Sequence, residues 1–286
     1  MAEAENQIID LDPKQFKMND YDNVRITMPA KPAMTAEDID AQLFQYVVSG
    51  GKKIKSIADL DDDWVKANFD MYETIDEVRQ AIKDQYDHDM EFEMSDLKFR
   101  VCCDALLARL DGEVPADILN HNIEVVREGN AERLKEMHIS MEQYLREEHL
   151  TPEQYDQKLH DETLYQMRLN VAIDIMADVL GMQVGNHELT EYLSAPDPEA
   201  FIAEIREKGQ VENARRAAVR VKTMRRVVDT AIVREEGAPE QSEEPKKKMP
   251  VIVDEDELNM ITIDNMPPTQ IRDDGATPSG FRILSE

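Results

Sequence analysis

Residues 74–112, TIDEVRQAIKDQYDHDMEFEMSDLKFRVCCDALLARLDG, decide the fold class of this chain. Apolar side chains recur along the stretch at steps of three or four residues, which is the spacing of one face of an α-helix. Thr74 followed by Glu77 is the pattern of a capping box, and Gly112 is a typical helix stop. At about 1.5 Å per residue, such a helix extends roughly 50 Å. Its apolar face consists of Val78, Ile82, Tyr86, Met90, Met94, Leu97, Val101 and Ala105.

Other segments carry the same signals for helix starts and stops. Thr35 with Asp38 predicts a helix start, Thr151 before Pro152 predicts another, and Gly181 predicts a stop. Aromatic residues make up only 6% of the chain and there are ten glycines, which is few for a sheet-based fold with many tight turns. The predicted fold class is therefore all-α, with one short extended segment near residues 22–28. Helices are predicted over residues 35–50, 74–112, 151–181 and 210–233, with shorter ones beginning near 115, 141, 186 and 197.

Composition divides the chain into four predicted parts. Residues 1–21 are polar and acidic and are expected to form a flexible arm, and residues 22–48 hold the extended segment and a connecting helix. Residues 49–233 form the helical domain. Residues 234–286, rich in Pro, Ser, Gly and acids, are predicted to be a mostly disordered acidic tail. Two apolar patches in that tail, Pro250–Val253 and Met260–Ile263, are candidates for an added strand or a partner contact.

The charge restricts the classes of partner. A formal net charge of −28 repels phosphate backbones and anionic lipid surfaces, so neither nucleic acid nor a membrane is an expected partner. Cys102 and Cys103 are adjacent within the long predicted helix and are interpreted as small buried apolar residues in a reducing compartment. The N-terminus lacks the pattern of a secretory signal, and no apolar run reaches the length of a membrane span. The sequence predicts a cytoplasmic protein.

Residues for catalysis or for metal binding are not grouped in any known motif. The stretch His187–Glu191 resembles a zinc-protease motif but has Glu191 in place of the second histidine. The acidic runs Asp61–Asp63 and Asp254–Glu257 lack the spacing of a calcium loop. The sequence contains no phosphate-binding loop, dinucleotide motif, nucleophile elbow or zinc-spaced cysteine pair. We predict a protein without cofactor or metal that is not an enzyme.

An ordered series of short motifs resembles the C-terminal chaperone domain of the trigger factor family. The series begins with LDDDWVKANF at residues 60–69 and continues with TIDEVR at residues 74–79. Val114-Pro115 opens the next segment, and the last helix begins near Asn213. The resemblance covers roughly residues 22–233, and it rests on the order of the motifs, because each one alone is common.

The resemblance implies a fold and a function. The implied fold is an elongated multi-helix body with arm-like helical hairpins, as in trigger factor C-terminal and SurA-like chaperones, with arms at residues 118–180 and 186–233. The implied function is an ATP-independent chaperone that binds unfolded or nascent polypeptides in an apolar cradle. Sixteen methionines suit varied apolar partners, although a methionine at helical spacing fits an ordinary core equally well. The candidate client-binding residues are Met137, Ile139, Met141, Tyr144, Leu145, Tyr155, Met167, Met182, Leu193 and Phe201.

The sequence also departs from the family pattern. The first 21 residues are too few for the ribosome-docking domain of the family, so the sequence does not establish contact with the ribosome. Only residues 49–62 stand where the family has its prolyl-isomerase domain, so isomerase activity is not expected. The alternative function is that of a dedicated adaptor or assembly protein, which would use the same fold to bind one partner. A second alternative is a prolyl isomerase by family name only, which is not expected to be active.

The last predicted helix concentrates positive charge in an otherwise acidic chain. We expect its cations to pair with acidic neighbours, such as those of the long helix, and to hold arm and body together; a nucleic-acid patch is the less favoured interpretation. The cations are Arg215, Arg216, Arg220, Lys222, Arg225 and Arg226.

Overall fold

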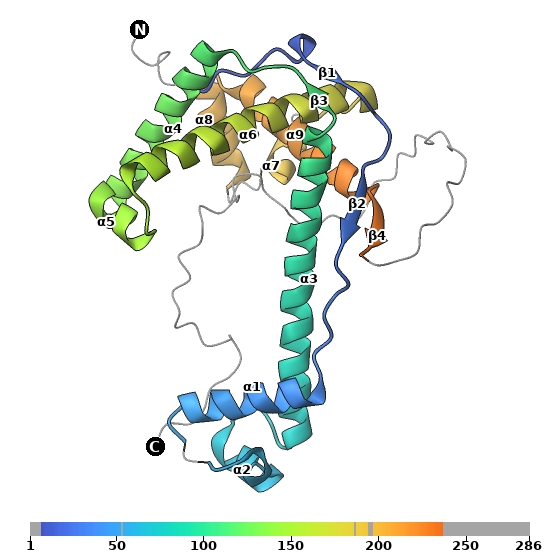
Figure 1. The fold of residues 1–286 in the computed structure, drawn as a ribbon, viewed down its shortest axis with the longest axis vertical. Coiled ribbons are helices and arrows are strands. Elements are labelled where there is room, and N and C mark those ends of the chain that lie inside the picture. Colours follow the sequence, from blue (N-terminus) through green and yellow to red (C-terminus); the bar gives the residue numbers. More distant parts are fainter. Residues whose placement is uncertain (1–6, 53, 186, 194–196, 237–286) are drawn as a thin grey trace. The chain divides into compact units, whose positions relative to one another are not determined.

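The computed structural model describes residues 7–52, 54–185, 187–193 and 197–236 (Figure 1). The predicted tail segments and the expected cap at Asn186 lie outside these residues. Helices dominate the described chain, so the predicted all-α class is confirmed. The helices are α1 (Ala36–Ser49), α2 (Asp62–Asn68), α3 (Ile75–Leu107), α4 (Ala116–Glu136), α5 (Met141–Glu147), α6 (Pro152–Leu180), α7 (Leu189–Tyr192), α8 (Pro198–Glu207) and α9 (Val211–Asp229). Short strands β1 (Lys17–Met18), β2 (Arg25–Met28), β3 (Leu110–Asp111) and β4 (Ile232–Glu235) and the 3-10 turns Pro13–Gln15 and Ile57–Asp59 complete the described elements.

The described chain divides into two compact units. The large unit contains residues 7–27 and 100–234, and the small unit contains residues 28–99 together with 235 and 236. Each unit has its own cluster of buried apolar residues. Because a separate core is the physical basis of an independent folding unit, we describe the two in turn.

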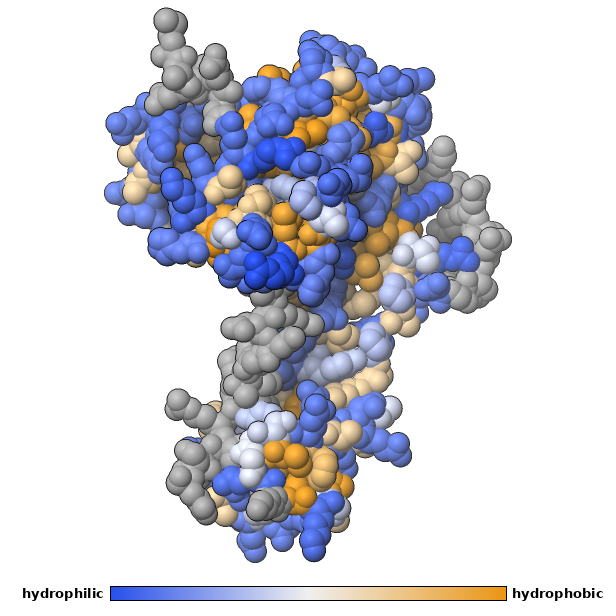
Figure 2. All heavy atoms as spheres, turned by 60° about the vertical axis from the view of Figure 1, so that its left-hand side comes forward, coloured by the Kyte–Doolittle hydropathy of each residue, from blue (hydrophilic) through white to orange (hydrophobic). Residues whose placement is uncertain are grey.

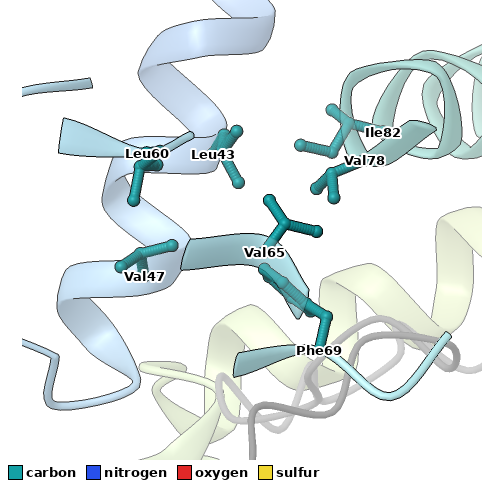
Figure 3. Packing of buried hydrophobic residues seen from close by; sticks show 7 residues of the cluster. All are labelled: Leu43, Val47, Leu60, Val65, Phe69, Val78 and Ile82. Carbon is teal, nitrogen blue, oxygen red and sulfur yellow. The ribbon is translucent and has the colours of Figure 1, made fainter. Parts of the chain in front are cut away.

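The small unit is built around side chains that repeat at helical spacing. Leu43 and Val47 lie one turn apart on α1, and Val78 and Ile82 lie one turn apart on α3, so each helix offers one apolar face. Figure 3 shows these side chains converging with Val65 of α2, with Phe69 just after that helix and with Leu60 just before it. All seven are at most 5% exposed, which makes this cluster the centre of the unit.

Capping boxes begin α1 and α3 of the small unit, where the sequence predicted them. The Asp38 backbone N–H donates to the Thr35 hydroxyl over 3.2 Å, while the Thr35 N–H donates to the Asp38 carboxylate over 3.0 Å. Thr74 and Glu77 make the same reciprocal pair at 3.3 and 3.2 Å. These bonds satisfy backbone donors that would otherwise lack partners in the first turn.

The large unit is centred on α6. This helix packs against both α4 and α9, and it therefore buries residues on more than one side. Its start is a third capping box, in which the Thr151 N–H donates to the Gln154 side chain over 2.8 Å, and it ends at Gly181 with φ 63°. The buried residues of α6 are Tyr155, Leu159, Thr163, Met167, Leu169, Val171, Ala172, Ile173, Met176 and Ala177.

Residues 7–21 differ from the flexible arm expected of the sequence. Leu11, Phe16 and Met18 are buried, and β1 pairs with β3 in an antiparallel ladder. The fully buried side chain of Asn122 on α4 holds the backbone of Ile9. The Ile9 N–H donates to the Asn122 side-chain oxygen over 2.8 Å, and the Asn122 side-chain amide donates to the Ile9 carbonyl over 3.0 Å. The acidic composition concealed three apolar residues whose partners are distant in sequence.

The last helix is shorter than predicted, because the chain changes to a strand. Helix α9 ends at Asp229, and the Ile232 N–H donates to the Val24 carbonyl over 2.8 Å. The Glu236 N–H donates to the Met28 carbonyl over 2.9 Å. Donor and acceptor both advance by four residues between these bonds, so β4 runs parallel to β2. The extended segment predicted near residues 22–28 is thus a strand, with Ile26 and Met28 buried and alternate residues exposed.

Candidate polypeptide-binding surfaces

Five of the ten candidate client-binding residues lie together where α4, α5 and α6 meet. We call this group the corner surface; its members are Met137, Ile139, Met141, Tyr144 and Leu145. Two turns of the same kind shape it. His138 after α4 and His149 after α5 have φ values of 58° and 56°, and each is followed by an apolar residue and a Ser or Thr cap. In both turns, a backbone N–H donates a hydrogen bond to a carbonyl of the preceding helix. The Ile139 N–H donates to the Leu134 carbonyl over 2.9 Å, and the Leu150 N–H donates to the Leu145 carbonyl over 2.8 Å.

The corner surface is open to solvent on one side and anchored on the other. Met137 is 56% exposed, and the other four members are half-buried. The ring of Tyr144 meets the edge of the Tyr155 ring with centroids 6.2 Å apart, which fixes α5 against α6. Burial, with a contribution from Glu148, raises the pKa of Tyr144. The phenol therefore stays neutral at physiological pH and adds uncharged aromatic area to the surface.

Two further candidates belong to the core and not to an open surface. Tyr155 is 7% exposed and Met167 is 6% exposed, both on α6. The Asn122 amide donates to the Met167 sulfur over 3.3 Å, and Asn130 donates to the Tyr155 hydroxyl over 3.3 Å. These contacts hold α4 against α6. A bound polypeptide would have to separate the two helices to touch them.

Two of the three remaining candidates, Leu193 and Phe201, pack around a second apolar cluster of the large unit. Both are partly buried against Val184, Leu189, Tyr192, Ile205, Ala218 and Val221. Met182, which follows the end of α6, is half-buried. The structure thus gathers five candidates in the corner surface and two at this cluster.

A hollow of about 380 Å³ lies beside the second cluster, between α7 and α8, and it was missed by the sequence analysis. Ile202 lines the hollow and also packs against the cluster. The sequence did contain a signal for an apolar residue at this place, because Ile202 lies three residues before the buried Ile205 on the same face of α8. Helical spacing alone, however, does not indicate that a hollow lies beside it. Its lining residues are His187, Thr190, Pro198, Glu199, Ile202, Ala203 and Arg206. Figure 2 shows apolar areas of the surface between polar residues on one face of the molecule.

Four of the six predicted cations of α9 pair with acidic residues: Arg215 with Glu212 of the same helix, and Arg216, Arg220 and Lys222 with residues outside it. Arg220 binds the two carboxylate oxygens of Asp174 on α6 over 2.8 and 2.7 Å, and it also donates to Asp10 over 2.8 Å. Arg216 reaches Asp10 over 2.7 Å, and Lys222 reaches Glu188 over 2.7 Å.

These ion pairs shift the pKa values of the groups that form them. Burial alone would raise the pKa of Asp10, but Arg220 and Arg216 outweigh it and lower the pKa. Burial would likewise lower the pKa of Arg220, but Asp174 and Asp10 outweigh it and raise the pKa. Lys222 lowers the pKa of Glu188. All these groups are therefore charged at neutral pH, and the pairs fix α9 to α6, to the segment before α7 and to the N-terminal segment.

The described residues offer little for covalent chemistry. Cys102 and Cys103 are buried, and burial raises the pKa of Cys103 to about 12, so its thiol stays protonated and unreactive. Across the ranges that the structure describes, no three His, Cys, Asp or Glu side chains come together in a way that could hold a metal ion. No helix in those ranges is both long and apolar enough to span a membrane.

Comparisons with known proteins agree with the helical architecture. Residues 74–229 match the family described as "Bacterial trigger factor protein (TF) C-terminus". The trigger factor of Syntrophomonas wolfei subsp. wolfei is 24% identical over 226 residues, which are 77% of this chain and 51% of that protein. The trigger factor of Pelotomaculum thermopropionicum is 23% identical over 211 residues, 70% of this chain and 47% of that protein. The trigger factor of Mycobacterium avium is 24% identical over 204 residues, 67% of this chain and 43% of that protein.

The helical architecture and these matches define a protein of a chaperone family. The family match covers more than half of the 286 residues, and this chain therefore belongs to the trigger factor C-terminal family, a family of chaperones. The chain spans about half the length of the curated relatives that it matches. The matched region is the C-terminal domain, which is not the catalytic prolyl-isomerase domain of the family.

Proposed function

We propose that this chain is an ATP-independent chaperone that binds unfolded or nascent polypeptides through apolar surface on its helical domain. The observation that carries the proposal is the corner surface. There, the exposed Met137 and four half-buried apolar residues follow one another along the chain from the end of α4 into α5. An adjoining set of this kind can cover an apolar segment of a client, whereas a single exposed apolar residue cannot.

The chemistry of the corner surface suits varied clients. Met137 and Met141 have unbranched, polarisable side chains that adapt to partners of different shape. Tyr144 adds an aromatic face that is held in place by Tyr155. A rigid aromatic anchor beside flexible thioethers combines contact area with a low cost of ordering side chains.

Charge supports the same function. Acidic residues surround the corner, among them Glu136 and Glu142, and the chain as a whole has a net charge of −28. Such a rim attracts basic segments and repels acidic ones, and it keeps the chaperone itself soluble while apolar surface is open. We expect basic, apolar segments to bind best.

The proposal is tested by suppression of client aggregation. A chemically denatured client is diluted into buffer with the full chain or with the double variant Met137→Ser, Met141→Ser, and light scattering is recorded. Loss of two apolar contacts should raise the chain concentration needed for half-suppression about tenfold, which corresponds to about 1.4 kcal/mol of binding. Val179→Ser is the matched control, because Val179 is similarly exposed, at 52%, on α6 outside the corner. It should leave the concentration unchanged.

The outcomes separate the candidate functions. Equal loss in the double variant and in the control would exclude the corner as the client surface. If the unaltered chain suppresses the aggregation of no client but captures one stoichiometric partner, the dedicated adaptor is the better description. We also expect no turnover in a prolyl-peptide isomerisation assay, because the matched domain is not the catalytic one of the family.

A further inference from the structure

The outer edge of β4 has no strand beside it among the described residues. Strand β2 occupies one side, toward which the backbone of Ile232 and Glu236 points. Backbone direction alternates along a strand, so the N–H and C=O groups of Val233 and Glu235 point to the other side. All four residues of β4 are exposed, with Ile232 at 50% and Val233 at 46%. An exposed apolar edge of this kind can pair with another strand, because its backbone groups are available for hydrogen bonds.

We propose that the C-terminal segment Met249–Val253 of the same chain adds to this edge as a third, antiparallel strand. Val251, Ile252 and Val253 form a run of β-branched residues, the type that strands favour. Residues 237–247, which include Gly237, connect the segment to the end of β4 and are long enough for a hairpin loop. Because the connection is short, the effective concentration of the segment at the edge is high.

The single proline of the segment fixes the register. Pro250 has no N–H, so it must lie opposite a β4 residue whose backbone points away from the new strand. Arg234 is such a residue, since its neighbours Val233 and Glu235 point outward. With Pro250 opposite Arg234, Val251 lies opposite Val233 and Ile252 lies opposite Ile232. Apolar pairs then form on both faces of the ribbon.

Charge fixes the direction. In the antiparallel arrangement Lys248 lies opposite Glu236, and the acids 254–257 continue toward the last turn of α9, which carries Arg226. In a parallel arrangement with Pro250 opposite Arg234, Lys248 would instead lie opposite Ile232 and would lose Glu236 as its partner. The second apolar patch, Met260–Ile263, is preceded by acids and lacks the basic run, so it matches the edge less well.

The test is a cysteine scan in the full chain. Ile232→Cys is combined with one cysteine at a time over positions 248–264, and the rate of disulfide formation under a mild oxidant is measured by mass spectrometry. The native Cys102 and Cys103 are buried and do not compete. We expect the rate at position 252 to exceed the rates at 251 and 253 about tenfold, because neighbouring residues point to opposite faces.

Charge reversal sharpens the scan. Lys248→Glu should slow the cross-link of positions 232 and 252 at low salt, and the added change Glu236→Lys should restore it. A rate that declines smoothly with distance along the tail would overturn the proposal. So would a maximum at positions 260–263, which would assign the edge to the second patch, or a disulfide-linked dimer, which would assign it to a second copy of the chain.

Discussion

Helix α9 and the corner surface are held in place by different kinds of contact, ion pairs in the first and apolar contacts in the second. On α9, Arg220 lies between Asp174 and Asp10 with its side chain only 13% exposed, so charge fixes the helix at a defined place. At the corner, Met137 is 56% exposed, and the ring of Tyr144 meets the edge of the Tyr155 ring. Buried ion pairs define geometry, because a displaced charge is costly, whereas apolar contacts tolerate rearrangement. The comparison indicates a fixed support in one part of the large unit and an adaptable surface in another.

The largest expected effect comes from removing the central cation. Arg220→Ala leaves Asp174 and Asp10 as neighbouring, partly buried carboxylates without their shared partner. We expect the free energy of unfolding of the large unit to fall by about 3–5 kcal/mol, measured by urea denaturation followed by circular dichroism. Arg216→Ala is the matched control, since Arg216 pairs with the same Asp10 but its side chain is 53% exposed. It should cost only about 0–1 kcal/mol.

Equal losses in these two variants would contradict the comparison, because they would mean that burial does not distinguish the two arginines. Amide exchange in the Arg220→Ala variant shows which part of the unit is affected. If exchange becomes faster in residues 7–21 alone, Arg220 fixes only the N-terminal segment.

A smaller effect should appear on acidification. The pKa of Asp10 in the folded chain is lowered from its ordinary value of 3.8, with Arg220 and Arg216 outweighing burial. A lowered pKa means that the stabilisation by Asp10 is complete above the ordinary value and is lost as the pH falls through the lowered one. We expect Asp10→Asn to reduce the free energy of unfolding by about 1.5 kcal/mol near pH 6, and this difference to shrink near pH 2.5.

Asp178→Asn provides the reference for that measurement, because Asp178 is exposed on the same helix as Asp174. Its effect should be small at both pH values. A difference between the unaltered chain and Asp10→Asn that stays constant with pH would mean that the carboxylate charge contributes nothing to holding the N-terminal segment.

The sequence predicted those parts of the fold that depend on neighbouring residues. The helix starts at Thr35, Thr74 and Thr151 are capping boxes, in which the hydroxyl and its partner lie three residues apart, so the pattern is visible in the sequence itself. Helix α2 was missed because its seven residues are too few to display a helical period. Only its cap, the Asp61 side chain accepting from the Trp64 N–H over 2.8 Å, was a usable signal.

Features that depend on distant residues were not predictable in the same way. The apolar spacing of α9 continues from Val228 to Ile232, so the sequence indicated a longer helix, but β2 offers backbone bonds that favour a strand there. Leu11 is buried within an acidic segment that gave no periodic signal. At the candidate site, Tyr155 and Met137 have equivalent apolar character in the sequence. Their difference in exposure arises from which helices pack against them, and a single sequence does not contain that information.

The smallest expected effect concerns the turn that shapes the corner. His138 has a φ of 58°, in the left-handed region, where a side chain is strained and glycine is not. His138→Gly should therefore raise the free energy of unfolding by about 0.5–1 kcal/mol, the relief of strain being partly offset by the greater freedom of glycine in the unfolded chain. His138→Ala keeps a side chain in the same conformation and should give no such gain, so the pair isolates backbone strain from any loss of imidazole contacts. If both variants gain equally, the imidazole and not the backbone is the unfavourable element. If His138→Gly also leaves aggregation suppression unchanged, client binding at the corner depends on its exposed apolar side chains and not on the conformation of this turn. The contribution of α9, in contrast, depends on fixed geometry.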